Sequence, residues 1–220
     1  MERFEDVESN GRRPGKRKDT AARILLAAER VFGERGFRGA RTRDIAAAAR
    51  ANLSAIHYHF GSKEDLYGAV LRERFGELRR AVDAALQREK EPAARVHAFV
   101  DAHFDMIASH PDMPRIMVDA VLRNEPAVRA VVRDTIRPIF DALVATLADS
   151  IESRKIRPVD PRQTMISAIG MNAIYFVARA LVEELFGSEN EAYSPAAVAA
   201  RKEHVVDLLL LGLLPREQLP

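Results

Sequence analysis

Residues 42–66 of the chain read TRDIAAAARANLSAIHYHFGSKEDL, and this stretch decides the fold. Thr42 is a suitable N-cap for a first short helix, and Asn52 is a suitable N-cap for a second one over about 53–59. Two short helices joined by a tight turn are typical of a helix-turn-helix. The second helix of such a pair has the right dimensions to enter the major groove of DNA.

The flanking sequence predicts further helices and no strand. Before the motif, apolar residues recur at three- and four-residue spacing over about 20–34, and Gly36 supplies a stop after which Phe37 enters the core. After the motif, Gly61 breaks the chain and Ser62 with Asp65 forms an S-x-x-D capping signal. Further helices are predicted near 63–89, 92–109, 112–123, 126–154 (kinked by Pro138), 161–186 and 195–213.

Composition narrows the class of protein. The 220 residues are enough to bury a substantial core, and 47% hydrophobic with 30% charged residues is typical of soluble globular proteins. The lack of cysteine excludes disulfides, a thiolate metal site and a cysteine nucleophile. The N-terminus has no apolar core of a secretory signal, and no apolar run is long enough to span a membrane. We therefore expect a cytoplasmic protein.

Basic residues are concentrated in the first quarter of the chain. From Arg12 to Lys63 there are 13 Lys or Arg against 4 Asp or Glu, a balance of +9, whereas the whole chain carries +2. This asymmetry predicts a polyanionic partner for the N-terminal part alone. Residues 1–18 are predicted to form a flexible basic arm, which either contacts DNA beside the major groove or serves as a solubilising tail.

Three segments together resemble the DNA-binding domain of the TetR family of bacterial transcriptional regulators. They are ILLAAERVFGERGF (24–37), TRDIAAAA (42–49) and IHYHFGSKEDL (56–66). The resemblance implies an all-α protein with a helix-turn-helix domain over 19–64 and a helical effector-binding and dimerisation domain over 65–220. It also implies a DNA-binding regulator without cofactor or enzymatic activity, commonly a repressor that a small-molecule effector releases from a palindromic operator.

We expect the exposed face of the second short helix to read the bases. Small residues there let the backbone approach the groove floor, where Ala55 could meet a thymine methyl group. The resemblance implies phosphate contacts at Tyr58 and Lys63. Thr42 offers a hydroxyl and a helix N-terminus to another phosphate, and Arg43 lies beside it. The candidate base-reading residues are Asn52, Leu53, Ser54, Ala55 and His57.

One position departs from the family pattern. Arg50 stands in the turn between the two short helices, where family members usually have glycine. A positive φ there costs a non-glycine residue roughly 1 kcal/mol. Arg50 either tolerates this geometry or adds a phosphate contact.

The region between about 65 and 190 is predicted to enclose an effector cavity. Met and aromatic side chains recur there at helical spacing, which alone is more typical of plain core. Pro138 inside a helix, and polar residues beside the aromatics, favour a cavity for an apolar or aromatic ligand, with or without a negative charge. The candidate ligand-binding residues are Phe104, Met117, Phe140, Met171, Asn172, Tyr175 and Arg179, with Met106, Met113, Met165 and Phe176 as further lining candidates.

A homodimer is expected, because one recognition helix reads too few base pairs for useful specificity. The helices near 161–186 and 195–213 are the expected interface, since stretches that are apolar on all sides need more than one partner surface. The alternative is that they only fill the core of one subunit. The residues concerned are Ile166, Ile169, Gly170, Ala173, Ile174, Val177, Val205, Val206, Leu208, Leu209 and Leu213.

Three other functions stay open on the residues alone. A metal-responsive regulator would need a metal site, whereas solvated surface positions are the more common explanation for such residues. A catalytic helical protein has little support, because there is no phosphate loop, nucleophile elbow or HExxH motif. Non-specific nucleoid binding through the basic arm is the third. The possible metal ligands are His97, Asp101, His103, Asp105 and His110.

Overall fold

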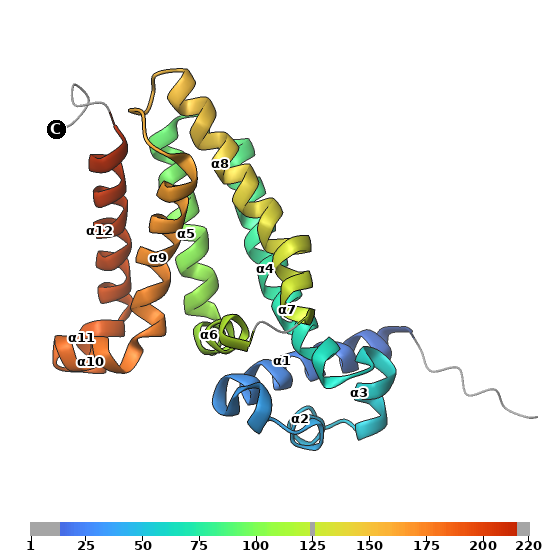
Figure 1. Ribbon diagram of the computed structural model, residues 1–220. Helices are drawn as coiled ribbons and strands as arrows, with labels where there is room; N and C mark the ends of the chain where they lie inside the picture. The colour runs from blue at the N-terminus through green and yellow to red at the C-terminus, as the bar shows by residue number, and fades with distance from the viewer. Residues whose placement is uncertain (1–13, 124–125, 215–220) are drawn as a thin grey trace, which may run out of the picture.

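The computed structural model describes residues 14–123 and 126–214, and every regular element in them is helical. An N-terminal head contains the helix-turn-helix, and its last helix leads into a long helix that continues into a bundle (Figure 1). The fold prediction is therefore confirmed. The head consists of α1 (Pro14–Gly39), α2 (Thr42–Ala48) and α3 (Leu53–Phe60), and the long helix is α4 (Lys63–Arg88).

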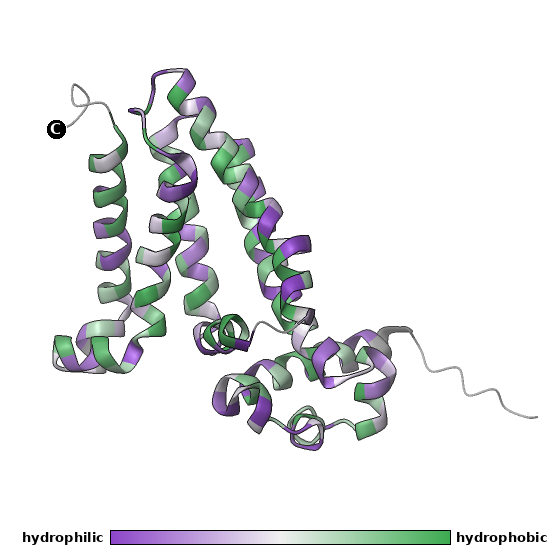
Figure 2. Cartoon of the chain, viewed as in Figure 1, coloured by the Kyte–Doolittle hydropathy of each residue, from purple (hydrophilic) through white to green (hydrophobic). Residues whose placement is uncertain are grey.

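The bundle is built from the remaining helices. Helix α5 packs between α4 and α12, and α6 lies across the junction, against α1 of the head (Figure 1). Figure 2 shows mostly hydrophobic residues in the C-terminal turns of α12. The elements are α5 (Pro92–Ser109), α6 (Met113–Arg123), α7 (Pro126–Val131), the π-helical turn η1 (Val132–Ile136), α8 (Arg137–Glu152), α9 (Pro161–Val177), α10 (Arg179–Phe186), α11 (Glu189–Tyr193) and α12 (Pro195–Leu213).

An aromatic cluster joins the head to α4. The ring of Tyr67 in α4 lies edge-on to Phe32 and Phe37 of α1, with ring centroids 4.9 and 5.1 Å apart. Phe37 enters the core directly after Gly36, whose φ of 65° interrupts the regular helix at the predicted stop. The head and the start of α4 thus share one hydrophobic core.

Two of the three predicted helix caps are present. The side chain of Asn52 accepts a hydrogen bond from the Ala55 backbone N–H, and Ser62 and Asp65 form a reciprocal capping box at the start of α4. The hydrogen bonds from Ser62 lower the pKa of Asp65. The prediction for Thr42 was wrong by one residue, because Arg41 occupies the N-cap position without a side-chain bond.

The predicted boundary of the basic arm was wrong for residues 14–18. Helix α1 begins at Pro14 rather than near Thr20. Proline is favoured in the first turn of a helix, and the Lys and Arg residues that follow it are good helix formers, so the basic segment extends α1. Residues 1–13 lie outside the described residues.

The helix predicted over 126–154 is divided. Pro138 has no N–H to donate, and the turn before it widens so that the Arg137 N–H bonds to the Val132 carbonyl. The predicted distortion at Pro138 therefore takes the form of the π-helical turn η1.

The helix predicted over 161–186 is also divided, at Ala178, and α11 was not predicted. Helices α9 and α10 meet at 76°. Across the described residues, no single helix is both long and apolar enough to cross a membrane, and α9 and α10 meet that criterion only as this bent pair.

Candidate nucleic-acid interface and effector cavity

Helix α3 presents its polar face to solvent and anchors its apolar face in the head. Ile56 is completely buried, whereas Tyr58 is 64% and Leu53 is 43% exposed. At the N-terminus of the helix, Ser54 Oγ donates to Asn52 Oδ1 at 3.0 Å, and the same oxygen caps the helix. These contacts fix the exposed first turn of α3, which is the part of a recognition helix that meets base edges.

The ring of His57 has a defined orientation. Its Nδ1 atom lies 2.9 Å from the Gly61 carbonyl oxygen, which can only accept a hydrogen bond. In the neutral ring the proton therefore sits on Nδ1, and Nε2 is an acceptor. Because His57 is exposed, Nε2 can accept from the exocyclic amino group of cytosine or adenine.

The turn between α2 and α3 has the geometry expected from the sequence. Arg50 has φ 49°, the left-handed region that glycine occupies at lower cost. Its N–H bonds to the Ala47 carbonyl, and the Ala51 N–H bonds to that of Ala46, so the backbone is paired despite the strain. The Arg50 side chain is exposed on the head.

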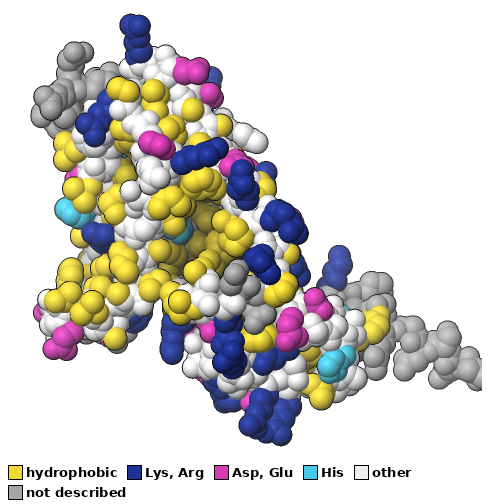
Figure 3. Space-filling model, in the orientation of Figure 1, with side chains coloured by type: hydrophobic (Ala, Val, Ile, Leu, Met, Phe, Trp, Pro, Cys, Tyr) yellow, Lys and Arg dark blue, Asp and Glu magenta, His cyan; other side chains and the backbone are white. Residues whose placement is uncertain are grey.

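Positive charge surrounds α2 and α3. Arg43 is exposed, with Asp44 3.8 Å away, and Thr42 is half-buried in the first turn of α2. Figure 3 shows Lys and Arg side chains gathered on the outer end of the head, away from the bundle. Lys63 behaves differently, because its Nζ donates to the Ala40 carbonyl at 2.8 Å and lies 4.4 Å from the centre of the Phe37 ring.

The bundle contains an apolar cavity of about 190 Å³ that opens to the surface (Figure 3). It lies between α4, α5, α6, α8 and α9 and is visible as a hydrophobic hollow above the head (Figure 3). A second apolar cavity, of about 50 Å³, shares Phe99 and Leu143 with it. The larger cavity is lined by Phe75, Leu78, Phe99, His103, Met106, Ile107, Met113, Pro114, Met117, Ile136, Ile139, Phe140, Leu143, Ile169, Ala173 and Val177.

A buried pair of polar side chains lies at the wall of this cavity. The Nδ1 atom of His103 is 3.0 Å from Nδ2 of Asn172, which is completely buried. Burial lowers the pKa of His103 to about 4, so its ring is neutral near pH 7.

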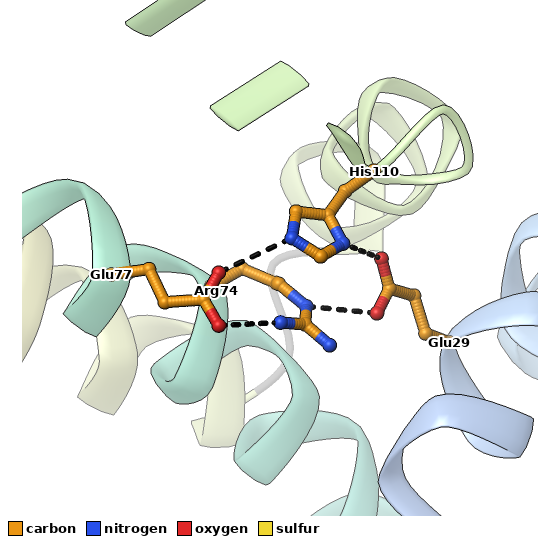
Figure 4. Close-up of polar contacts among 4 residues, drawn as sticks. All are labelled: Glu29, Arg74, Glu77 and His110. Atoms are coloured by element: carbon orange, nitrogen blue, oxygen red, sulfur yellow. Dashed lines mark hydrogen bonds and ion pairs between the residues drawn. The ribbon is translucent and has the colours of Figure 1, made fainter. Parts of the chain in front are cut away.

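An ion network connects the head to the bundle (Figure 4). Buried Arg74 of α4 donates to Glu29 of α1 at 2.8 Å and to Glu77 at 2.7 Å. His110, between α5 and α6, has Nδ1 3.0 Å from Glu29 and Nε2 3.2 Å from Glu77. The four side chains thus join α1, α4 and the α5–α6 turn.

Comparison with known proteins gives the family. Residues 24–70 match the family model of bacterial regulatory proteins, tetR family, and residues 92–209 match that of the tetracyclin repressor-like C-terminal domain. The second match alone spans more than half of the chain. The chain belongs to the TetR family. It is therefore a DNA-binding transcriptional regulator and not an enzyme.

Relatives of this TetR-family chain match along most of its length. The transcriptional regulator RutR of Escherichia coli K12 is 25% identical over 212 residues, which cover 96% of this chain and 98% of RutR. The transcriptional activator FasR of Mycolicibacterium smegmatis is 29% identical over 177 residues, covering 78% and 77%. The structure of FadR from Bacillus subtilis in complex with stearoyl-CoA has a TM-score of 0.70 at 18% identity, covering 87% and 98%.

The predicted ligand-binding residues fall into two groups. Met117 and Phe140 line the larger cavity, as do Met106 and Met113, while Met165 lines the smaller one. Phe104, Met171, Tyr175 and Arg179 do not line either cavity, and Asn172 reaches the larger one only through His103.

Other contacts hold three residues of the second group, namely Phe104, Tyr175 and Arg179. Phe104 packs edge-on against Phe176 in the core, and the Tyr175 hydroxyl donates to the Ala192 carbonyl. Arg179 pairs with Glu183 at 2.7 Å. Arg179, directly after the bend between α9 and α10, also lies 4.3 Å from the centre of the Tyr193 ring of α11.

The residues considered as metal ligands do not form one site. In the described part of the chain, no group of three or more His, Cys, Asp or Glu could hold a metal ion. Asp101 and Asp105 both pair with Lys202, at 3.1 and 2.7 Å, whereas His103 faces the cavity and His110 belongs to the ion network.

Sequence reasoning missed two features of this region. It assigned His103 only to a possible metal site, and it did not identify the network around Arg74. Glu29, Arg74 and His110 lie far apart in the sequence, so no local pattern could have joined them. The i, i+3 pair of Arg74 and Glu77 was the one available signal.

Proposed function

We propose that this protein is a homodimeric repressor that binds an inverted-repeat operator and leaves it when a small molecule occupies the larger cavity. The observation that carries the proposal is the position of α6 between cavity and head. Met113 and Met117 of this helix line the cavity, while Asp119 accepts a hydrogen bond from the Phe37 N–H at 3.0 Å and lies 3.3 Å from the Tyr67 hydroxyl.

Movement of α6 would be transmitted to the head through these bonds. The Tyr67 hydroxyl also lies 2.9 Å from the Ile116 carbonyl, and burial raises the pKa of Tyr67, so the hydroxyl stays a donor. A ligand that favours a displaced α6 therefore favours a different orientation of the head relative to α4. A difference of roughly 1–3 kcal/mol between the two states would change operator affinity about 5–150-fold.

The proposed DNA contacts follow from exposure and chemistry. Asn52, Leu53, Ser54 and His57 are exposed and meet base edges. Ala55 is half-buried and packs against the core of the head, so we assign it only the remaining exposed part of its methyl group as a contact. We assign phosphate contacts to Thr42, Arg43, Tyr58 and Lys63 and add exposed Arg50. For Lys63 the contact requires its ammonium to serve a phosphate while it stays on the Ala40 carbonyl, which its three donors allow.

We propose a dimer through α9 and α12, which pack side by side in one subunit. Ile166, Ile174 and Leu208 are between 45% and 58% exposed on these helices, and a Cβ atom built at Gly170 meets no atom within 4 Å. An exposed apolar face with a small residue in it suits close packing against its symmetry mate. The other predicted interface residues lie elsewhere. Ile169, Ala173 and Val177 line the larger cavity, and Val177 is also 37% exposed. Four residues of α12 are buried within the subunit: Val205, Val206, Leu209 and Leu213.

Because its partner is chromosomal DNA, we expect the protein in the bacterial cytoplasm. The direction of regulation is tested by deleting the gene and sequencing transcripts. For a repressor, transcripts beside the bound sites rise in the deletion strain. A fall at the same genes would instead favour activation, the mode named for FasR. Unchanged transcripts at every bound site would contradict regulation in either direction.

A further inference from the structure

The larger cavity has one polar group in an otherwise apolar wall. Among the described residues that line it there is no Lys, Arg, Asp or Glu, and His103 is the only lining side chain with a nitrogen or oxygen atom. Three phenylalanines and three methionines make up much of the remaining wall. The hydrogen-bonding capacity of His103 therefore determines which polar ligand atom this cavity can accept.

The partner of His103 fixes which ring nitrogen is available. Asn172 Nδ2 donates to Nδ1 at 3.0 Å, so the proton of the neutral ring is on Nε2. Asn172 is itself completely buried, and its Oδ1 atom has no partner among the described residues. No described residue pairs with Nε2, and this nitrogen keeps some exposed surface although His103 as a whole residue is 93% buried. A ligand that displaces water from this apolar wall must supply an acceptor for the Nε2–H, because otherwise the donor loses its hydrogen bond.

We propose that the cavity binds an uncharged, mainly apolar molecule that carries one hydrogen-bond-accepting oxygen, such as a ketone or an ester, and that His103 Nε2 donates to this oxygen. The inference rests on the proposed function, because it names the chemical class of the effector of that same cavity.

The wall disfavours an anionic effector. A carboxylate would lose its hydration and find no cation among the described lining residues, and His103 is neutral because burial lowers its pKa. The size of the cavity fits a small ligand, since an engineered protein cavity of about 150 Å³ binds benzene and this one measures about 190 Å³. The sequence predicted an effector with or without a negative charge, and the lining of the cavity favours the neutral molecule.

Three probes with the same phenylalkyl skeleton separate the possibilities. They are 4-phenylbutan-2-one, which has a carbonyl oxygen, butylbenzene, which has none, and 3-phenylpropanoate, in which a carboxylate replaces the methyl ketone. Binding to the full chain without DNA is measured by calorimetry near pH 7. We expect the ketone to bind at least tenfold more tightly than butylbenzene, which corresponds to about 1.4 kcal/mol, and the carboxylate to bind most weakly.

Variants at two positions of the cavity wall test whether His103 causes the preference for the ketone over butylbenzene. In His103→Leu the ratio of ketone to butylbenzene affinity should fall close to one, whereas Met106→Leu, a substitution of similar volume in the same wall, should keep the ratio. The ranking of the three probes in the unaltered protein does not depend on the folding of any variant. Tightest binding of the carboxylate, no binding of any probe, or a ketone preference that survives His103→Leu would each overturn the inference.

Failure of the proposed function would look different. If the ketone preference is found but the protein binds no specific DNA, or releases none when the ketone is added, the ligand class stands and the repressor role falls. If specific DNA is bound and the ketone preference is missing, only the inference about the ligand falls.

Discussion

The Nδ1 atom of His110, in the turn between α5 and α6, lies 3.0 Å from the Oε1 atom of Glu29 in α1. Its other ring nitrogen faces Glu77 at 3.2 Å, and buried Arg74 donates to both carboxylates. A carboxylate only accepts, so His110 satisfies both contacts when both ring nitrogens carry a proton. The contact between the α5–α6 turn and the head therefore runs through two carboxylates and the buried guanidinium of Arg74.

This network predicts a large loss of stability when Arg74 is removed. In Arg74→Met, Glu29 stays 95% buried and loses its main cation, so the free energy of unfolding should fall by about 3 kcal/mol in urea titrations. Arg79 of the same helix pairs with Asp83 at the surface, and Arg79→Met should cost less than about 1 kcal/mol. Equal losses for the two variants would show that burial of the network does not matter.

A second prediction concerns acid. The pKa of His103 is lowered from its ordinary 6.5 to about 4 by burial, so between these pH values the unfolded chain binds a proton that the folded chain does not. The contribution of His103 to the free energy of unfolding is therefore complete above pH 6.5. It is lost as the pH falls toward 4, which lowers the free energy of unfolding by up to about 3 kcal/mol. In His103→Gln this part of the loss should be absent. The same change at exposed His97 is the control and should keep the slope of the unaltered protein.

The recognition helix gives a third prediction. His57→Ala removes the outward acceptor and should change which bases are preferred, while Tyr58→Phe removes a hydroxyl assigned to phosphate and should weaken operator and random DNA alike. Lys63→Ala should weaken both DNAs too, and it also removes the bond to the Ala40 carbonyl, so its melting temperature must be measured. Mobility-shift titrations on both DNAs decide. Unchanged affinity for operator DNA in all three variants would contradict the assignment of DNA contacts to His57, Tyr58 and Lys63.

The fourth prediction tests the dimer. Ile174→Glu places a charge in the exposed face of α9 and should convert the protein to the 24.5-kDa monomer in light scattering. Leu122 is even more exposed, at 80%, but lies on α6, and Leu122→Glu should leave the dimer intact. If Leu122→Glu dissociates the dimer and Ile174→Glu does not, the interface is formed by α6 and not by α9.

The features that could be predicted from the sequence are local. The starts of α3 and α4 could be predicted from Asn52 and from the pair of Ser62 and Asp65, because a helix cap involves residues only a few positions apart. The left-handed turn at Arg50 was expected only from the resemblance to TetR-family members, which usually have glycine at this position. The division at Ala178 could not be predicted, because no glycine or proline stands there and the flanking residues continue the apolar pattern.

The cavity depends on contacts between distant segments. Tyr175 and Phe140 are equally good candidates by residue type, but only the packed structure shows that one is held by the Ala192 carbonyl and the other faces the hollow. His103 and Asn172 are separated by 69 positions, so their pairing has no sequence signal. Residue type therefore indicated the region of the cavity and not its lining.

We propose that two copies of α3, one from each subunit, read a symmetric DNA site. Selection of bound duplexes from a random DNA pool, followed by sequencing, tests it most directly. We expect an enriched inverted repeat whose half-sites are about 10 base pairs apart, centre to centre, or a multiple of this spacing. Enrichment of a single unrepeated motif, or of no motif at all, would contradict it.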